Sequence, residues 1–138
     1  MAGYIYIILT VLLWGLAPIL DKVALKGSSP LAGIFVRTLV VFALIGLSFP
    51  WLYKEKLLSA LSLRSVIFFI LSGICAGFLG MITYYSALKV LPSSKVVPLC
   101  STYPLISAVL AVVFLGESLT WVRFLGIILI ITGIFLVK

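Results

Sequence analysis

Arg37 is the one charged residue that lies well inside an apolar run of this sequence. It follows the start of that run, at residue 31, by about 10 Å at 1.5 Å per residue of helix. Its guanidinium offers a planar fork of donors, so one hypothesis is that Arg37 binds an anionic or zwitterionic solute. The alternative is that the side chain extends to the polar end of the run, near Lys22 and Lys26, and only anchors the helix.

Proline and aromatic residues also occur inside the apolar runs. Pro18 cannot donate a backbone hydrogen bond, which leaves the carbonyl of Trp14 without its usual partner, and Pro104 has the same effect in a later run. Together with Tyr84 and Tyr103, these residues would suit helices that line a cavity for amphipathic solutes. The alternative is that proline is common in membrane helices and that tyrosine anchors a helix at an interface.

Groups that usually carry catalysis are scarce. The sequence has no histidine, three acidic residues and two cysteines. A Ser–His–Asp triad, a Cys–His pair and a zinc cluster are therefore excluded. Cys75 and Cys100 fall inside apolar runs, so no disulfide is predicted. We predict no cofactor, no metal site and no enzymatic activity.

The composition predicts that lipid surrounds this chain. Hydrophobic residues make up 64% of the 138 residues and charged residues only 9%, whereas soluble domains carry roughly 25%. The net charge of +7 does not indicate nucleic-acid binding, because most of the basic residues lie between or beyond the apolar runs and they form no basic stripe. Such charges are typical of the ends of membrane helices.

Five apolar runs are long enough, or nearly so, to cross about 30 Å of hydrocarbon as helices. They are residues 4–20, 31–53, 66–88, 96–115 and 119–137. The first run lacks the basic start of a cleavable signal, so it is expected to be a spanning helix. We therefore predict an all-α membrane protein with five transmembrane helices in one compact bundle. Residues 1–138 would form a single domain, located in the cell (inner or plasma) membrane.

The basic residues are nearly balanced between the two sides that five spans define. One side carries four and the other carries five: Lys54, Lys56, Arg64 and Arg123 against Lys22, Lys26, Lys89, Lys95 and Lys138. The positive-inside rule normally gives a clear excess on one side. Either the chain inserts in both orientations and pairs with an inverted copy, or a few residues decide the orientation.

Small residues are spaced for close approach of helices. Gly126 and Gly133 are seven positions apart and share one face of the last run, where we predict dimer contact. Gly73 and Gly77 form a small-xxx-small pair in the third run, which we assign to packing within the chain.

Several motifs follow one another along almost the whole chain in an order typical of a known family. They are Trp14–Pro18 in the first run, Arg37 after Pro30, Tyr84–Leu88, Pro92–Ser94, Tyr103–Leu105, the Phe114–Thr120 turn and Leu125–Ile134. In these motifs the chain resembles the EamA-type domain of the drug/metabolite transporter superfamily. It also resembles the small multidrug-resistance exporters in its last run. Those exporters carry a glutamate within the first helix, whereas this chain has no carboxylate before Asp21.

The resemblance implies a function and a partner. Most members of that superfamily carry two five-helix domains in opposite orientation and export metabolites or drugs. A single domain would therefore need an inverted twin, so we expect a secondary transporter of small organic metabolites that works by alternating access as an antiparallel homodimer. Two alternatives are a non-transporting assembly or scaffold subunit that pairs with another membrane protein, and a membrane-embedded enzyme.

Overall fold

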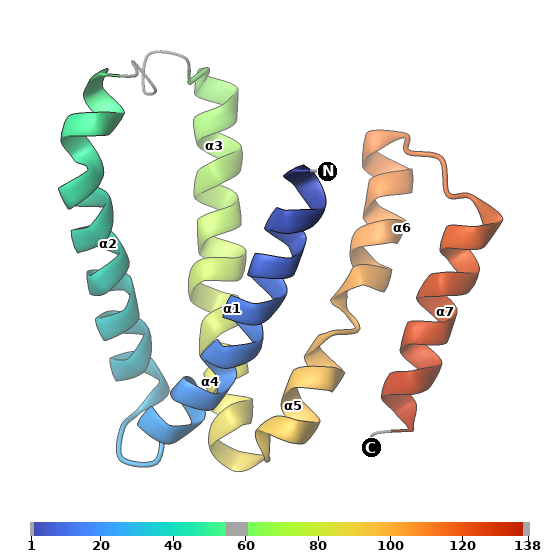
Figure 1. The fold of residues 1–138 in the computed structure, drawn as a ribbon, viewed down its shortest axis with the longest axis horizontal. Helices are drawn as coiled ribbons and strands as arrows, with labels where there is room; N and C mark the ends of the chain where they lie inside the picture. The colour runs from blue at the N-terminus through green and yellow to red at the C-terminus, as the bar shows by residue number, and fades with distance from the viewer. Residues whose placement is uncertain (1, 55–60, 137–138) are drawn as a thin grey trace. The chain divides into compact units, whose positions relative to one another are not determined.

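All regular structure in the described part of the chain is helical, as Figure 1 shows. The computed structural model describes residues 2–54 and 61–136. The elements are α1 (Ala2–Ala24), α2 (Pro30–Lys54), α3 (Leu63–Ser72), a π-helix η2 (Gly73–Leu79), α4 (Gly80–Val90), α5 (Ser93–Cys100), α6 (Tyr103–Leu115) and α7 (Trp121–Phe135). Lys56 and Lys138 of the charge count, and the end of the fifth run at residue 137, lie outside the described residues.

Four helical segments have the length and composition to cross a membrane. They are Gly3–Ala24, Pro30–Trp51, Leu63–Val90 and Ser93–Leu115, with a shorter apolar helix at Trp121–Ile134. The two segments of 22 residues measure about 33 Å at 1.5 Å per residue, which matches the roughly 30 Å of hydrocarbon in a bilayer. The prediction of an all-α membrane protein with about five helices is confirmed.

The chain divides into two compact units, Met1–Lys89 and Val90–Lys138. The first contains α1, α2, α3, η2 and nearly all of α4, and the second contains α5, α6 and α7. The assignment of residues 1–138 to one domain stays a prediction.

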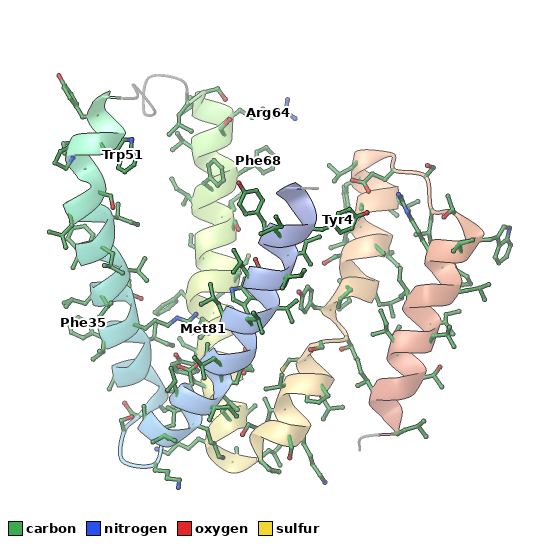
Figure 2. All side chains as sticks on the ribbon, viewed as in Figure 1. Tyr4, Phe35, Trp51, Arg64, Phe68 and Met81 are labelled. Carbon is green, nitrogen blue, oxygen red and sulfur yellow. The ribbon has the colours of Figure 1, made fainter. Side chains whose placement is uncertain are left out.

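Most large apolar side chains point away from the protein interior. Phe35 and Trp51 on α2 and Phe68 on α3 are examples labelled in Figure 2, and all three are exposed. In water such surface would cost about 25 cal/mol per Å², so it is suited to contact with lipid. The buried residues in the described part of the first unit are Pro18 in α1, Leu25 just after α1, Ile34 at the start of α2, and Tyr85 and Leu88 in α4.

The third span contains a π-helical turn that the sequence pattern does not predict. The backbone N–H of Gly80 bonds the carbonyl of Cys75, five residues back. A Cβ atom at Gly80 would lie 2.9 Å from that carbonyl oxygen, so only glycine fits there. By contrast, a Cβ atom at Gly73 or Gly77 would have no neighbour within 4 Å, so no other helix of the first unit approaches these two glycines closely. Their packing role within the chain stays a prediction.

Local hydrogen bonds and turns divide the second unit into three helices. The fourth span is interrupted after Cys100 and resumes at Tyr103, with Pro104 in the first turn of α6, where its missing N–H costs little. Gly116 ends α6 with a left-handed φ of 66°, which glycine adopts without strain. Thr120 then caps α7 by accepting the backbone N–H of Arg123.

Candidate functional site

The first helix extends beyond the apolar run and carries Asp21 into the protein. The apolar run ends at residue 20, but α1 continues to Ala24 because the backbone hydrogen bonds of the helix do not require apolar side chains. In α2, the hydroxyl of Ser29 accepts the N–H of Ala32, which fixes the start of the helix and places Arg37 in its second turn or just beyond. The last part of the third span, α4, contributes Tyr84 and Tyr85.

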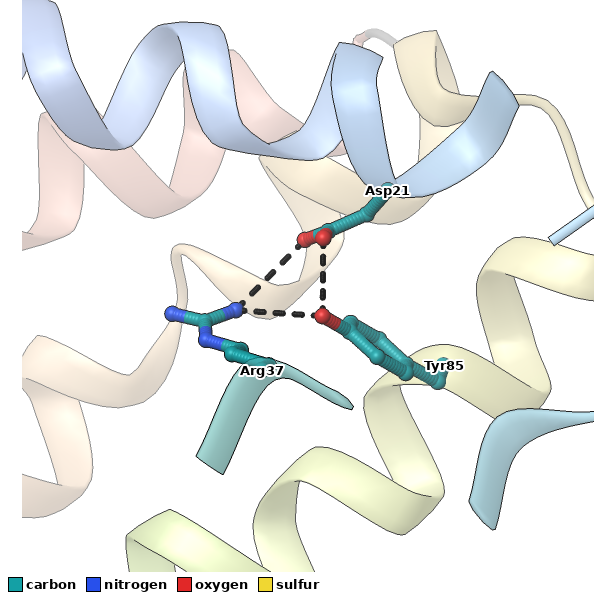
Figure 3. A network of polar contacts seen from close by, with 3 residues as sticks. All are labelled: Asp21, Arg37 and Tyr85. Carbon is teal, nitrogen blue, oxygen red and sulfur yellow. Dashed lines mark hydrogen bonds and ion pairs between the residues drawn. The ribbon is translucent and has the colours of Figure 1, made fainter. Parts of the chain in front are cut away.

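Asp21, Arg37 and Tyr85 form one polar network from three helices, shown in Figure 3. The Tyr85 hydroxyl donates to Asp21 Oδ1 at 2.7 Å and accepts from Arg37 Nη1 at 3.2 Å. Arg37 Nη1 also forms an ion pair with Asp21 Oδ2 at 3.6 Å. The hydroxyl thus uses both its donor and its acceptor capacity to join two opposite charges.

The two charged side chains of the network differ in how exposed they are. The side chain of Arg37 is 49% exposed, whereas that of Asp21 is 18% exposed, and Tyr85 is only 2% exposed. Ionisable residues inside membrane helices are costly unless they pair with one another or face a cavity. Arg37 does both, because it pairs with Asp21 and also lines a cavity.

Gly33 allows the ring of Tyr85 to lie directly against α2. A Cβ atom at residue 33 would be 3.0 Å from Tyr85 Cε2 and 3.2 Å from Cδ2. A side chain at this position would require the ring to shift by a few tenths of an ångström away from α2. The buried side chain of Leu25 lies on the same side, 3.8 Å from that Cβ position.

Two lysines that the sequence analysis assigned to the membrane interface bind backbone carbonyls near the network. Lys22 donates to the carbonyl of Leu88, in the last turn of α4. Lys89 donates to the carbonyl of Ser28, in the connection between α1 and α2, at 3.1 Å. Cations stabilise the carbonyl end of a helix, so Lys22 helps to hold α1 and α4 together at the level of Asp21.

A cavity of about 520 Å³ lies beside the network in the first unit. Its volume falls within the range of about 300–1,000 Å³ typical of small-molecule sites. The lining consists of apolar, small and aromatic side chains with one polar edge: Trp14, Ala17, Pro18, Asp21, Ile34, Arg37, Thr38, Val41, Ala76, Gly77, Met81 and Tyr84. The π-helical turn contributes Ala76 and Gly77 to its wall.

The structure brings together four of the predicted pathway residues: Trp14, Pro18, Arg37 and Tyr84 all line this cavity. Tyr103 does not line it; it belongs to the second unit, at the start of α6, and is exposed. Whether any of them contacts a solute stays a prediction.

Sequence reasoning missed Asp21, Gly33 and Tyr85 as parts of the network. A signal for Asp21 was present, because Trp14, Pro18 and Asp21 follow one another at positions i, i+4 and i+7, on one face of a helix. No comparable signal identifies Gly33, since its role depends on the ring that packs against it.

A second cavity, of about 330 Å³, shares Asp21 and Arg37 with the first. Tyr85 and Gly33 line it, and it extends to Ser28 in the connection between α1 and α2. The ion pair therefore borders two cavities. One is lined by Trp14 of α1, and the other reaches Ser28 in the connection between α1 and α2.

The second unit has a groove of its own between α6 and α7, with a volume of about 390 Å³. Glu117 and Arg123 border it, and Gly126 is one of its lining residues. A Cβ atom at Gly126 or Gly133 would meet no atom within 4 Å, so neither glycine packs closely against another helix of the second unit. Their predicted role in dimer contact stays untested.

Comparison with known proteins identifies the family. The profile of the EamA-like transporter family matches residues 1–138. The chain belongs to this family. The EamA-like resemblance predicted from the motifs is thereby confirmed, and the chain is a multi-pass membrane protein of a transporter family, whose members work in a lipid bilayer on small molecules.

One curated relative of this EamA-like chain adds no functional detail. It is an uncharacterised protein of Methanocaldococcus jannaschii, 43% identical over 60 residues. The match covers 44% of this chain and 44% of that protein. No solved structure is significantly similar to the chain.

Proposed function

We propose that this EamA-like chain is a secondary transporter of small organic metabolites. It works by alternating access, as an antiparallel homodimer in the cell membrane. The observation that carries the proposal is the cavity of about 520 Å³ with Arg37 and Asp21 at its edge, inside helices that are apolar enough to span a bilayer. Such a cavity, mostly apolar with few polar groups, is typical of a site that binds a small molecule.

The position of the ion pair supports alternating access. Arg37 and Asp21 border both the larger cavity and the second cavity of about 330 Å³ that reaches Ser28. A solute that moves from one cavity to the other passes this pair. The Asp21–Arg37–Tyr85 network can therefore act as a gate, which separates the cavities when the pair is formed and joins them when it opens.

The open wall of the larger cavity supports a dimer. Trp14 lines this cavity and is 68% exposed, so one unit does not enclose the space by itself. A second copy of the chain can supply the missing wall. The nearly equal numbers of basic residues on the two sides favour an inverted orientation of that copy.

Transport is tested with purified protein in liposomes that hold a defined mixture of organic acids, amines, amino acids and sugars. The solutes that leave or enter are measured by mass spectrometry, with empty liposomes as the reference. We expect at least one class of solute to move, and Arg37→Gln to abolish its movement. Lys95→Gln is the matched control, because it removes the same charge from an exposed position in the second unit. Absence of movement for every class would contradict the proposal and favour a non-transporting subunit.

The inverted dimer is tested separately with a reporter at the C-terminus that is active on only one side of the membrane. We expect equal signals from reporters specific for either side. A single orientation in all copies would contradict the antiparallel arrangement. It would not contradict the transport function, which the liposome assay tests.

A further inference from the structure

In the Asp21–Arg37–Tyr85 network the positive side chain is more exposed than the negative one. The Arg37 side chain is 49% exposed, whereas Asp21 is 18% exposed. Asp21 is also occupied on both oxygens, since Oδ1 accepts from Tyr85 and Oδ2 lies 3.6 Å from Arg37. A solute in the larger cavity therefore meets the guanidinium before it meets the carboxylate.

Arg37 keeps part of its hydrogen-bonding capacity available. Its contacts to Asp21 and Tyr85 both use Nη1. Within residues 2–54 and 61–136, Nη2 and Nε donate no hydrogen bond to another group. Nη2 and Nε lie on one edge of the guanidinium plane and together form a fork that suits the two oxygens of a carboxylate.

We propose, on the basis of the transport function proposed above, that the solutes of this protein are organic anions. The carboxylate of the solute binds the free edge of Arg37, and its apolar body lies along Trp14, Met81 and Tyr84 in the larger cavity. Tyr85 and Asp21 hold the opposite edge and act as the internal partner of the guanidinium when no solute is present.

This arrangement disfavours cations for a physical reason. A cationic solute at the same place would lie beside the exposed guanidinium, and it would have to displace the Tyr85 hydroxyl or Arg37 to reach Asp21. The two cations nearest in sequence to the network, Lys22 and Lys89, bind the carbonyls of Leu88 and Ser28 and add positive potential at the same end of the first unit.

The network also predicts the direction of an unusual mutational effect. Asp21 offsets the positive charge of Arg37 and repels an anion that binds the other edge of the guanidinium, so Asp21→Asn is expected to strengthen anion binding. Asparagine keeps an oxygen that can accept from Tyr85, so the position of Arg37 is retained. A purely structural role for Asp21 would give weaker binding instead.

The experiment uses the full chain in lipid nanodiscs with Trp51→Phe and Trp121→Phe, which leaves Trp14 at the cavity as the fluorescent reporter. Three probes share one aromatic body and differ in charge: phenylacetate, phenylacetamide and phenethylammonium. We expect phenylacetate to quench Trp14 at concentrations about tenfold lower than the other two, a difference in proportion to one good charge-assisted contact. Equal binding of the three probes, or tighter binding of phenethylammonium, would overturn the inference.

Variants in the same background complete the test. Arg37→Gln should lose the preference for phenylacetate, Arg37→Lys should keep part of it, and Asp21→Asn should bind phenylacetate about threefold or more tightly. Each variant is first checked for an unchanged size-exclusion profile. If Arg37→Gln does not fold, the preference for phenylacetate is measured in the conservative variant Arg37→Lys. Weaker phenylacetate binding in a folded Asp21→Asn would contradict the electrostatic effect of Asp21 that we infer.

The liposome assay separates the two proposals. If only amines or neutral solutes move, the anion assignment fails and the transport function stands. If phenylacetate binds as expected and no solute of any class moves, the transport function fails and the anion site stands as a binding site.

Discussion

The hydroxyl of Tyr85 donates to Asp21 at 2.7 Å and so joins two residues that lie 64 positions apart in the chain. The same hydroxyl accepts from Arg37 at 3.2 Å. In this way α4 closes a polar link between α1 and α2, and the geometry of the candidate site depends on it.

Tyr85→Phe tests this link because the ring remains against Gly33 while the hydroxyl is lost. Asp21 and Arg37 then each lose one hydrogen bond, which we expect to cost about 1–3 kcal/mol in this partly buried place. The measurement is the thermal midpoint of the protein in detergent, followed by size exclusion after heating. Tyr4→Phe is the control, because Tyr4 is exposed and far along α1 from Asp21. An equal midpoint for both variants would contradict a stabilising role of the Tyr85 hydroxyl.

Gly33→Ala tests the close contact between α2 and the Tyr85 ring. The added methyl group would lie 3.0 Å from Tyr85 Cε2, so we expect a loss of about 1–3 kcal/mol from overpacking. Gly46→Ala, in the same helix, is the matched control, because a methyl group there meets nothing within 4 Å. That control should be neutral or stabilising by up to about 1 kcal/mol, since alanine favours helix over glycine. Similar behaviour of the two variants would mean that the ring does not lie against Gly33.

Gly80→Ala tests the π-helical turn in the third span. A Cβ atom at Gly80 would lie 2.9 Å from the carbonyl oxygen of Cys75, so the turn has to rearrange and the cavity wall at Ala76 and Gly77 moves with it. We expect lower thermal stability and weaker solute binding. Gly73→Ala, at the first residue of the same turn, has free space around its Cβ position and should leave both unchanged. Unchanged binding in Gly80→Ala would show that the turn does not shape the cavity.

The order and approximate positions of the helices could be predicted from the sequence, because backbone groups in lipid have to form their hydrogen bonds within the segment. A segment such as 31–53 has to be helical in hydrocarbon, and the structure has a helix from Pro30 to Lys54. Arg37 could be identified as a candidate site residue, because a charged side chain inside such a segment is costly and is often functional. Trp14 and Pro18 shared its cavity in the structure because helical periodicity placed them on one face of α1.

The rest could not be predicted, because it depends on contacts between segments distant in the sequence. The first apolar run ends at residue 20, so its pattern does not indicate that α1 continues through Asp21 and places it near Arg37. Nothing in the local sequence distinguishes Tyr85, which is buried, from Tyr84 beside it. The π-helical turn also leaves no pattern in the sequence, since its one steric requirement is the glycine at position 80.

The opposite charges of Arg37 and Asp21 are expected to depend on each other. Arg37→Gln or Asp21→Asn leaves one charge without its partner at 3.6 Å, whereas the double variant leaves none. We therefore expect the double variant to be more stable than the sum of the two single effects predicts, by about 0.5–3 kcal/mol. The measurement is the thermal midpoint of all four proteins in one detergent. Additive effects would show that the two charges do not interact in the folded protein.

The face of α7 that carries Gly126 and Gly133 is the place where a second copy is expected to pack. A Cβ atom at either glycine meets no other helix of the second unit within 4 Å, so a helix from another chain can approach closely there. Gly126→Leu should therefore lower the yield of cross-linked dimer in membranes several-fold. Ile128→Phe, two positions along α7 and so on another face, also enlarges a side chain of this helix and should leave the yield unchanged. If both variants cross-link as well as the original protein, the dimer contact lies elsewhere; if neither forms a dimer, the effect is one of folding and not of this face.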